Sequence, residues 1–443
     1  MIRAIPQWPV DGQRPPCPER LPCWETLTNI IARRLSHRFA DIRCLTQKRR
    51  PPSIHRVLSD SCPPVRKPGT APEDRAFRPD VEGMRAVAIL LVVLFVVLFH
   101  AGVPHMAGGF VGVDVFFVIS GFVITGLLLR ERRATGGSGF LTFYARRARQ
   151  ILPAALLVII VSLISSYLLI GANYATLVAS DARWSALFLG DHHFISVYPN
   201  YLVSRPNSPL QQYWSLAVEE QFYLVYPAFF AALIMIPGMM SRRARLVTGL
   251  SAVIVISFLI SVATTRVNYL AANYSPFTRA WELALGALLA VTAAQLEKIP
   301  TATAAIMTWI GIVGILIAAV TFSVHLRYPG FIVALPTINA ALVIAGGTVV
   351  TRQGAESVLR LLPFRWLGRW SYSWYLWNSS VLAIGAAVLH KSVNTTSIPI
   401  KLALVTFALI LAAATYFLVE QPFRHSTILT RSPRASIIGA CYS

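Results

Sequence analysis

Charged residues are scarce in this chain of 443 residues, and acidic residues are the scarcest of them. Asp, Glu, Lys and Arg make up 13% of the chain, about half the share in an average soluble domain. The hydrophobic fraction is 55%, and the mean hydropathy is +0.58. This composition excludes an ordinary soluble enzyme. Repeated apolar runs of roughly 20 residues, each about one bilayer crossing long, indicate a polytopic membrane protein.

Cysteine is also rare, and its positions form no recognisable pattern. Four of the five cysteines lie within the first 62 residues, and none shows metal-ligand spacing. An odd number of cysteines in a segment expected to be cytoplasmic argues against a disulfide framework. We therefore expect no bound metal and no tightly bound cofactor.

The first 76 residues lack any apolar run long enough for a signal peptide. They are rich in Pro and Arg, which predicts a mostly disordered cytoplasmic extension. Such a basic segment either attaches to anionic lipid beside the first membrane helix or is dispensable. We expect a transmembrane domain over 77–425 and a short cytoplasmic tail over 426–443.

The transmembrane domain contains ten apolar runs, and no internal repeat relates them. They predict an all-α bundle of about ten transmembrane helices, near 84–103, 110–130, 150–171, 215–237, 246–265, 279–294, 303–323, 331–350, 371–390 and 399–419.

The positive charge is distributed unevenly between alternate loops. One set of loops holds 17 Lys and Arg residues and the other set holds 5. The positive-inside rule places the richer set in the cytoplasm of a bacterial inner membrane, with both termini cytoplasmic. The net charge of +21 is explained by this clustering at helix ends, so we expect no nucleic-acid partner.

Ionisable side chains recur near the predicted outer ends of four helices. Such groups are costly in a membrane, so each is a candidate functional residue: His100, Asp114, Glu219, Glu220, Arg279 and Glu282. We expect them to converge. A histidine beside a carboxylate is a general base that can activate a hydroxyl, because the carboxylate fixes the imidazole tautomer. Ser120, in VISGF, is flanked by apolar residues and is predicted to be a small helix-packing residue.

The inner loop before the third helix is a second candidate site. Arg146, Arg147 and Arg149 follow the aromatic pair Phe143 and Tyr144. One interpretation is ordinary anchoring at the membrane surface. The other is binding of a phosphorylated cytosolic donor, because guanidinium groups match phosphate geometry.

The long outer segment 172–214 has two features that could be mistaken for sites. Its amphipathic stretch around Trp184 either lies in the membrane interface or folds back into the bundle. The sequence DHHF at 191–194 has the composition of a metal-binding tract. Two adjacent histidines on a helix cannot both face one ion, so we predict a surface loop there.

At these positions the chain resembles the acyltransferase-3 family of integral membrane acyltransferases. The matching stretches occur in the family's order over about 77–425: FRPDVEGMRAVAILLVV, GGFVGVDVFFVISGFVITGLLL, FYARRARQILPAALL, YWSLAVEEQFYLVYP, FTRAWELALGALLA, GRWSYSWYLW and VEQPFRH. The resemblance implies about ten helices. It also implies transfer of acyl groups, often acetyl, from acyl-coenzyme A to hydroxyls of surface carbohydrates such as O-antigen, exopolysaccharide or peptidoglycan.

The resemblance also implies roles for particular residues. Arg85 and His100 correspond to the family's signature residues on the first helix, and the Arg-rich loop and the Glu219–Glu220 pair gain functional weight. The chain departs from the pattern in three ways. Fourteen residues separate Arg85 from His100, more than is usual, and VVLF occurs in tandem at 92–95 and 96–99, which indicates a four-residue insertion. Asn378 stands where the family commonly has His, and no extracytoplasmic esterase-like domain follows 425.

The sequence thus predicts an inner-membrane O-acyltransferase. His100 would deprotonate the acceptor hydroxyl, and Asp114, Glu219 or Glu220 would orient it near Arg85. The loop arginines and Tyr144 would hold acyl-coenzyme A, with acetyl-coenzyme A the expected form. Supporting roles are expected for Arg279, Glu282 and Asn378. The alternative is a glycolipid flippase whose intramembrane charges form a proton relay, whereas a purely structural role would leave the convergence of these groups unexplained.

Overall fold

A computed structural model describes residues 78–99, 108–135, 140–197, 208–323, 326–349, 351, 353–393 and 395–425. The N-terminal extension, the C-terminal tail and His100 lie outside these residues. The predictions made for them therefore stay predictions.

The described residues form helices, and no strand occurs among them. An apolar chain in lipid must satisfy its backbone hydrogen bonds internally, and a helix does so within one segment. Each predicted apolar run coincides with one long helix over its described residues. These helices are α2 (Pro79–Leu94), α3 (Gly112–Thr135), α4 (Phe140–Leu169), α7 (Tyr213–Met235), α8 (Arg242–Val267), α10 (Pro276–Leu296), α11 (Thr301–Thr321), α12 (Ala334–Gly346), α14 (Leu362–Val388) and α15 (Ile398–Thr415).

Shorter elements extend or connect these helices. They are η3 (Phe95–Phe99), η4 (Gly109–Val111), α5 (Ala172–Ala186), α6 (Gly190–Val197), α9 (Tyr269–Tyr274), α13 (Glu356–Leu359), η5 (Tyr416–Glu420) and α16 (Gln421–His425). Several helix starts follow from local sequence. The side chains of Ser241 and Asn268 accept hydrogen bonds from backbone amides in the first turns of α8 and α9, and Pro79 and Pro276 are the first residues of α2 and α10.

Among the described residues, six helical stretches are long and apolar enough to cross a membrane: Gly109–Arg133, Thr142–Leu169, Arg242–Val267, Tyr269–Leu296, Thr301–Thr321 and Ile398–His425. The run near 279–294 is the shortest in the sequence, yet it lies within one of these long stretches. The structure thus confirms an all-α polytopic membrane protein, while the count of ten crossings stays a prediction.

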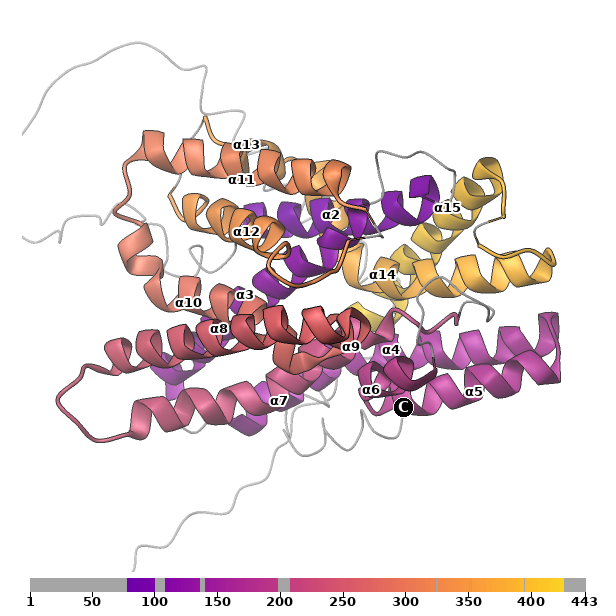
Figure 1. Cartoon of the computed structure of the whole chain (residues 1–443), viewed down its shortest axis with the longest axis horizontal. Coiled ribbons are helices and arrows are strands. Elements are labelled where there is room, and N and C mark those ends of the chain that lie inside the picture. Colours follow the sequence, from indigo (N-terminus) through magenta and orange to yellow (C-terminus); the bar gives the residue numbers. More distant parts are fainter. Residues whose placement is uncertain are drawn as a thin grey trace, which may run out of the picture. The chain divides into compact units, whose positions relative to one another are not determined.

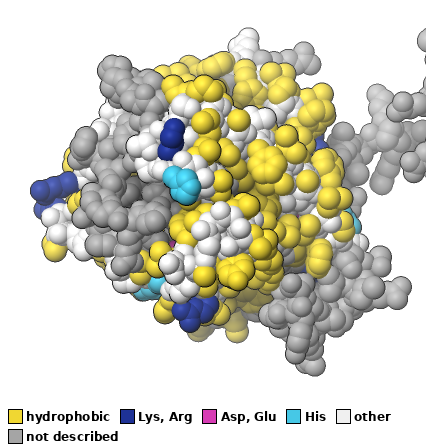
Figure 2. All heavy atoms as spheres, turned by 90° about the vertical axis from the view of Figure 1, so that its right-hand side faces the viewer, with side chains coloured by type: hydrophobic (Ala, Val, Ile, Leu, Met, Phe, Trp, Pro, Cys, Tyr) yellow, Lys and Arg dark blue, Asp and Glu magenta, His cyan; other side chains and the backbone are white. Residues whose placement is uncertain are grey.

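The turns between the helices gather at two ends of the bundle. The α7–α8 and α10–α11 turns lie at the left end in Figure 1, and the α4–α5 and α14–α15 turns lie at the right end. The first pair belongs to the loops predicted to be cytoplasmic and the second pair to the outer loops. Figure 2 views the right end, where Lys and Arg are few among the described side chains and hydrophobic side chains dominate one side. This agrees with the charge asymmetry of the sequence.

Helices α2 and α3 form the centre of the bundle, because residues of both belong to each of the two hydrophobic cores. Glycine permits their close contact with neighbouring helices. A Cβ atom on Gly121 of α3 would collide with the backbone oxygen of Leu283 on α10, and one on Gly368 of α14 would collide with that of Glu82 on α2. Gly112 of α3 meets the backbone of Ala88 on α2 in the same way. Helices α2, α3, α10 and α14 are therefore joined backbone to backbone.

The tandem VVLF repeat coincides with a change of helix type. Helix α2 ends at Leu94, and the following residues Phe95–Phe99 form the π-helical turn η3. Such π-helical turns are rare, occur mostly as single-turn bulges within α-helices, and are frequent at functional sites. The sequence interpretation assumed a regular α-helix throughout, and it did not foresee this turn immediately before His100.

The prediction of a surface loop at DHHF is wrong. These residues belong to α6. The preceding helix α5 folds back along α4 (Figure 1), which agrees with the second alternative given for this stretch. His193 is buried and its Nε2 lies 2.8 Å from Oδ1 of Asp181. Asp191 is also buried and accepts a hydrogen bond of 2.9 Å from Gln221 of α7. Burial raises the pKa of Asp191 above its ordinary value. His193 and Asp191 thus each have a hydrogen-bonding partner in the fold, which the residue pattern alone did not reveal.

We predict opposite effects of adding one methyl group at two glycines of α3. Gly121→Ala should lower the free energy of unfolding by about 1–3 kcal/mol, because the new Cβ atom meets the α10 backbone. Gly126→Ala is the matched control, since a Cβ atom there has no neighbour within 4 Å. It should be neutral or stabilising by up to about 1 kcal/mol. Thermal unfolding in detergent measures both, and equal effects would contradict the close contact.

Candidate active site

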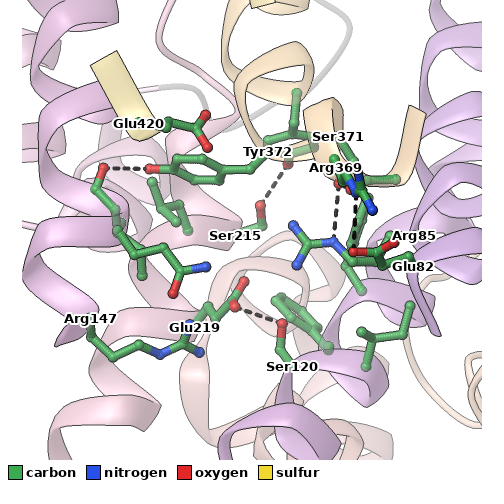
Figure 3. Close-up of a pocket in the computed structure, with 18 of the residues that line it drawn as sticks. Glu82, Arg85, Ser120, Arg147, Ser215, Glu219, Arg369, Ser371, Tyr372 and Glu420 are labelled. Carbon is green, nitrogen blue, oxygen red and sulfur yellow. Dashed lines mark hydrogen bonds and ion pairs between the residues drawn. The ribbon is translucent and has the colours of Figure 1, made fainter. Parts of the chain in front are cut away.

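A cavity of about 340 Å³ lies inside the bundle between α2, α3, α4, α7 and α14, and η5 and α16 complete its wall. Four arginines and three glutamates line it together with hydroxyl groups (Figure 3): Glu82, Arg85, Ser120, Arg147, Ser215, Glu219, Arg369, Ser371, Tyr372, Tyr375, Glu420 and Arg424. We call this the arginine cavity. So many charged groups in one enclosed space are costly unless they compensate each other or bind a ligand.

Arg85 points into the arginine cavity from α2 (Figure 3). Its Nε donates a hydrogen bond of 3.2 Å to Oγ of Ser371 on α14. We find no further hydrogen bond from this guanidinium group among the described residues. A guanidinium has five N–H donors, so Arg85 retains donors that a ligand can use.

Glu219 of α7 lies across the cavity from Arg85. Its Oε1 accepts a hydrogen bond of 2.6 Å from Oγ of Ser120 on α3 and another from the hydroxyl of Tyr223. The guanidinium of Arg147 lies over the Tyr223 ring, 4.3 Å from its centroid. Ser120 is therefore more than a helix-packing residue, which corrects the sequence interpretation. The correction was not foreseeable, because the partner of Ser120 is 99 residues away.

Only one of the three loop arginines reaches this cavity. Arg147 lines it, whereas Arg146 forms an ion pair of 2.9 Å with Glu131 and its side chain is 47% exposed. Arg149 is buried but lines neither this cavity nor the one described next. The hydroxyl of Tyr144 donates a hydrogen bond of 2.8 Å to the backbone oxygen of Leu224 and so ties α4 to α7. These four residues lie on the same helix, α4, and its rotation of about 100° per residue points their side chains in different directions.

A second cavity of about 370 Å³ lies beside the first. Its polar centre is Arg279 of α10, which donates hydrogen bonds of 2.8 Å to Asp114 and 2.9 Å to Glu282. The same guanidinium binds the backbone oxygen of Asn273 at 3.1 Å and its side-chain oxygen at 2.5 Å. The hydroxyl of Tyr328 also donates to Asp114. Aromatic side chains form much of the remaining wall, and we call this the aromatic cavity.

The predicted convergence of ionisable groups is thus divided between two sites. Asp114, Arg279 and Glu282 meet in one cluster, while Glu219 faces Arg85 and Arg147 in the other. Asp114 and Ser120 are six residues apart on α3, which places them about 9 Å apart along the helix. The sequence placed all these groups near one depth, because it could not resolve the direction of each side chain.

The candidates Asn378 and Glu220 also lie outside both cavities. Asn378 on α14 is fully buried, and neither atom of its amide has a hydrogen-bond partner among the described residues. Glu220 lines neither cavity, and its Oε1 is likewise buried without a partner in the described part of the chain. The roles expected of these two residues stay predictions.

Two side chains form the boundary between the cavities. Val113 of α3 and Tyr375 of α14 line both of them. The hydroxyl of Tyr375 lies 2.6 Å from Oγ of Ser215 on α7, and its ring packs edge-on against Phe116. A path from one cavity to the other therefore leads past Tyr375.

Sequence reasoning missed several charged residues of the arginine cavity. Glu82 on α2 faces Arg369 on α14 at 3.5 Å, and Glu420 accepts a hydrogen bond from Ser373. These residues occur in stretches already noted for their resemblance, such as FRPDVEGMR and VEQPFRH, but nothing in their spacing marked them as neighbours. Among the described residues, no group of three or more His, Cys, Asp and Glu side chains could hold a metal ion.

Comparison with known proteins gives the family. A family described as "Acyltransferase domain" matches residues 78–418, most of the chain. The chain belongs to the acyltransferase-3 family. This confirms the resemblance seen in the sequence motifs. The matched region contains all the lining residues of the arginine cavity except Glu420 and Arg424.

The relatives are O-acetyltransferases by name. The chain is 27% identical to a "Putative O-acetyltransferase" of Staphylococcus aureus (strain MRSA252), over 82% of this chain and 60% of the relative. It is 31% identical to the "Putative peptidoglycan O-acetyltransferase YrhL" of Bacillus subtilis, over 81% and 57%. It is 28% identical to the "Peptidoglycan O-acetyltransferase OatA" of Listeria monocytogenes, over 79% and 55%. The chain thus spans less than two thirds of these relatives. No solved structure matches it.

We predict that the Arg279 cluster is essential for folding. Arg279→Ala would leave Asp114 and Glu282 buried without their cationic partner, which costs about 3–5 kcal/mol for a buried pair. Arg327→Ala is the control, because Arg327 is exposed and should change stability by less than about 0.5 kcal/mol. Thermal unfolding in detergent, followed by loss of monodisperse protein, measures both variants. Equal stability of the two would show that the cluster is not a structural centre.

Proposed function

We propose that this protein is an integral membrane O-acyltransferase. It moves an acyl group, acetyl in the simplest case, from acyl-coenzyme A to a hydroxyl of a cell-surface carbohydrate such as O-antigen, exopolysaccharide or peptidoglycan. One observation carries this proposal. In a member of the acyltransferase-3 family, an internal cavity holds arginines with unused hydrogen-bond donors opposite a hydrogen-bonded glutamate. The printed names of the relatives favour acetyl as the group transferred.

The arginine cavity fits the donor. Coenzyme A carries phosphate groups, and guanidinium donors bind phosphate in bidentate geometry. Arg85 has donors left over after its bond to Ser371, and Arg147 faces the same space. Of the three loop arginines proposed from the sequence, Arg147 is therefore the one assigned to the donor.

The chemical step is transfer of the acyl carbon from sulfur to oxygen. His100 takes the proton of the acceptor hydroxyl as general base. The hydroxyl oxygen then forms a bond to the acyl carbon, the carbon–sulfur bond breaks, and the thiolate leaves with a proton returned to it. Glu219 is the carboxylate that we assign to orienting His100, because it shares a cavity with Arg85, whereas Asp114 is bound to Arg279.

The proposed location is the bacterial inner membrane, with both termini in the cytoplasm. The charge distribution between alternate loops supports this orientation. The donor then enters from the cytoplasmic side, where the Arg-rich loop lies. The partners are the lipid bilayer, acyl-coenzyme A and a carbohydrate or lipid-linked glycan.

A glycolipid flippase is the second candidate function. Two adjacent polar cavities inside one bundle favour it, because a translocated head group needs such a path. Mass spectrometry of surface glycans from cells with and without the gene separates the two functions. Loss of ester-linked acyl groups supports the enzyme. An unmodified glycan retained on the inner leaflet supports the flippase.

His100→Ala should abolish acyl transfer, because a positioned general base contributes about 10²- to 10⁴-fold to the rate. The variant should still insert into the membrane, and the acyl ester content of the surface glycan gives the readout. Activity within about threefold of the wild-type value would exclude His100 as the base, since that is far below the effect of a base.

Arg147→Gln should raise the KM for acyl-coenzyme A by roughly 10- to 100-fold, because hydrogen bonds to charged groups contribute about 1.5–3 kcal/mol. Its KM for the acceptor should change little. Arg146→Gln is the matched control: its exposed pair with Glu131 contributes at most about 1 kcal/mol. If both variants merely lower the amount of inserted protein, the loop arginines serve as membrane anchors instead.

A further inference from the structure

The aromatic cavity is enclosed by segments from both halves of the transmembrane domain. Helix α3 and the end of α2 form one side, and α9, α10 and the start of α7 form the other. Six aromatic side chains line it: Phe95, Phe110, Trp214, Tyr269, Tyr328 and Tyr375. Its volume of about 370 Å³ falls within the range of small-molecule sites, about 300–1,000 Å³. The donor is assigned to the arginine cavity, so the aromatic cavity still needs a ligand.

The charges of the aromatic cavity are satisfied within the protein. Arg279 uses four N–H groups for Asp114, Glu282 and Asn273, out of the five that a guanidinium has. One guanidinium is also matched by two carboxyl groups, so no spare positive charge remains for an anion. Arg85 in the other cavity shows the opposite situation, because most of its donors are unused by the described residues. The two cavities therefore suit chemically different ligands.

The lining of the aromatic cavity suits a ring that has both apolar faces and hydroxyl edges. The negative face of an aromatic ring attracts C–H groups, and a pyranose presents such groups on its faces. Asp114, Asn273 and Gln212 supply hydrogen-bonding groups to the same space. An acyl tail would instead leave Oε1 of Gln212, which has no hydrogen-bond partner among the described residues, buried and unpaired, which costs free energy.

We propose that the aromatic cavity is the acceptor subsite and binds an uncharged pyranose ring of the glycan. The assignment rests on the proposed acyltransferase function. The ring stacks on Tyr269 and Trp214, and its reacting hydroxyl points toward Tyr375. Because Tyr375 lines both cavities, the acceptor and the donor thioester meet at this side chain. Binding of an anionic sugar is disfavoured, because the carboxylates of the cluster repel it and Arg279 has no pair of free N–H groups to bind its carboxylate.

Protection of an engineered cysteine tests the site directly. The five natural cysteines are replaced by serine in the full chain, which is then reconstituted in nanodiscs. Leu270→Cys places a thiol in the cavity wall. Val267→Cys, three residues away and 90% exposed at the native valine, is the control, because Val267 lines neither of the two cavities described above. Labelling by a membrane-impermeant maleimide is timed with neutral methyl pyranosides of gluco, galacto, manno and N-acetylglucosamine configuration, with glucuronate, or with octanol.

At least one neutral pyranoside should slow labelling at Leu270→Cys by the factor 1 + [L]/Kd and leave Val267→Cys unchanged. Adding Tyr269→Ala should abolish this protection, because the stacking surface is lost. Protection by glucuronate as strong as that by the neutral sugars would overturn the proposal. So would protection by octanol alone, which would indicate an acyl-chain site, and so would the absence of any protection.

Failure of the proposed reaction and failure of the proposed subsite give different experimental results. Transfer from acyl-coenzyme A to glycan is measured on the same nanodiscs without a thiol probe. If transfer occurs but no pyranoside protects Leu270→Cys, the acceptor binds elsewhere and the enzyme assignment stands. If a pyranoside protects but no acyl group is transferred, the sugar site stands and the proposed reaction falls.

Discussion

The cost of ionised groups away from water determines how this bundle is built. On insertion scales a single Arg, Lys or Asp at the middle of a membrane helix costs about 2.5–3.5 kcal/mol. Arg279 and its two carboxyl partners are fully enclosed, and their mutual hydrogen bonds offset that cost. Arg279 and Glu282 belong to α10 and Asp114 to α3, so these two helices must assemble correctly before all three charges are matched. The chemistry of the site and the specificity of the fold thus depend on the same contacts.

The fold class and the helix positions were largely predictable from sequence. Apolar runs reveal helices because hydropathy is a local property, and the described long helices follow the predicted runs closely. Irregularities were harder to predict. The π-helical turn at Phe95–Phe99 depends on how α2 packs, and the return of α5 along α4 depends on contacts such as His193 with Asp181. Neither feature leaves a periodic signal in the residues that form it.

Some residues that line the cavities were predictable from sequence, but their arrangement was not. Arg85, Arg147 and Glu219 were identified from their unusual chemistry at membrane depth or their position in a charged loop, and the structure brings them together. The sequence could not tell that Asp114 belongs to a different cluster, or that Arg146 turns away to Glu131. Those outcomes depend on the rotation of each helix about its axis, where an error of one residue turns a side chain by about 100°. Ser120 was misjudged for the same reason.

The glycine contacts around α2 divide the walls of the arginine cavity into two kinds. Helices α2, α3 and α14, with α10 behind them, touch through their backbones, and such contacts leave no side chain that can change rotamer to allow a shift. Among the described residues, helices α4 and α7 and the turn η5 make no glycine contacts of this kind with the block. They meet it through side chains: Tyr372 of α14 donates to the backbone of α4, and Glu219 of α7 accepts from Ser120 of α3. Small sliding motions occur between helices packed through side chains. Arg85 and Ser371 therefore stand on a fixed frame, and a sliding motion that widens the arginine cavity is expected on the side of α4 and α7.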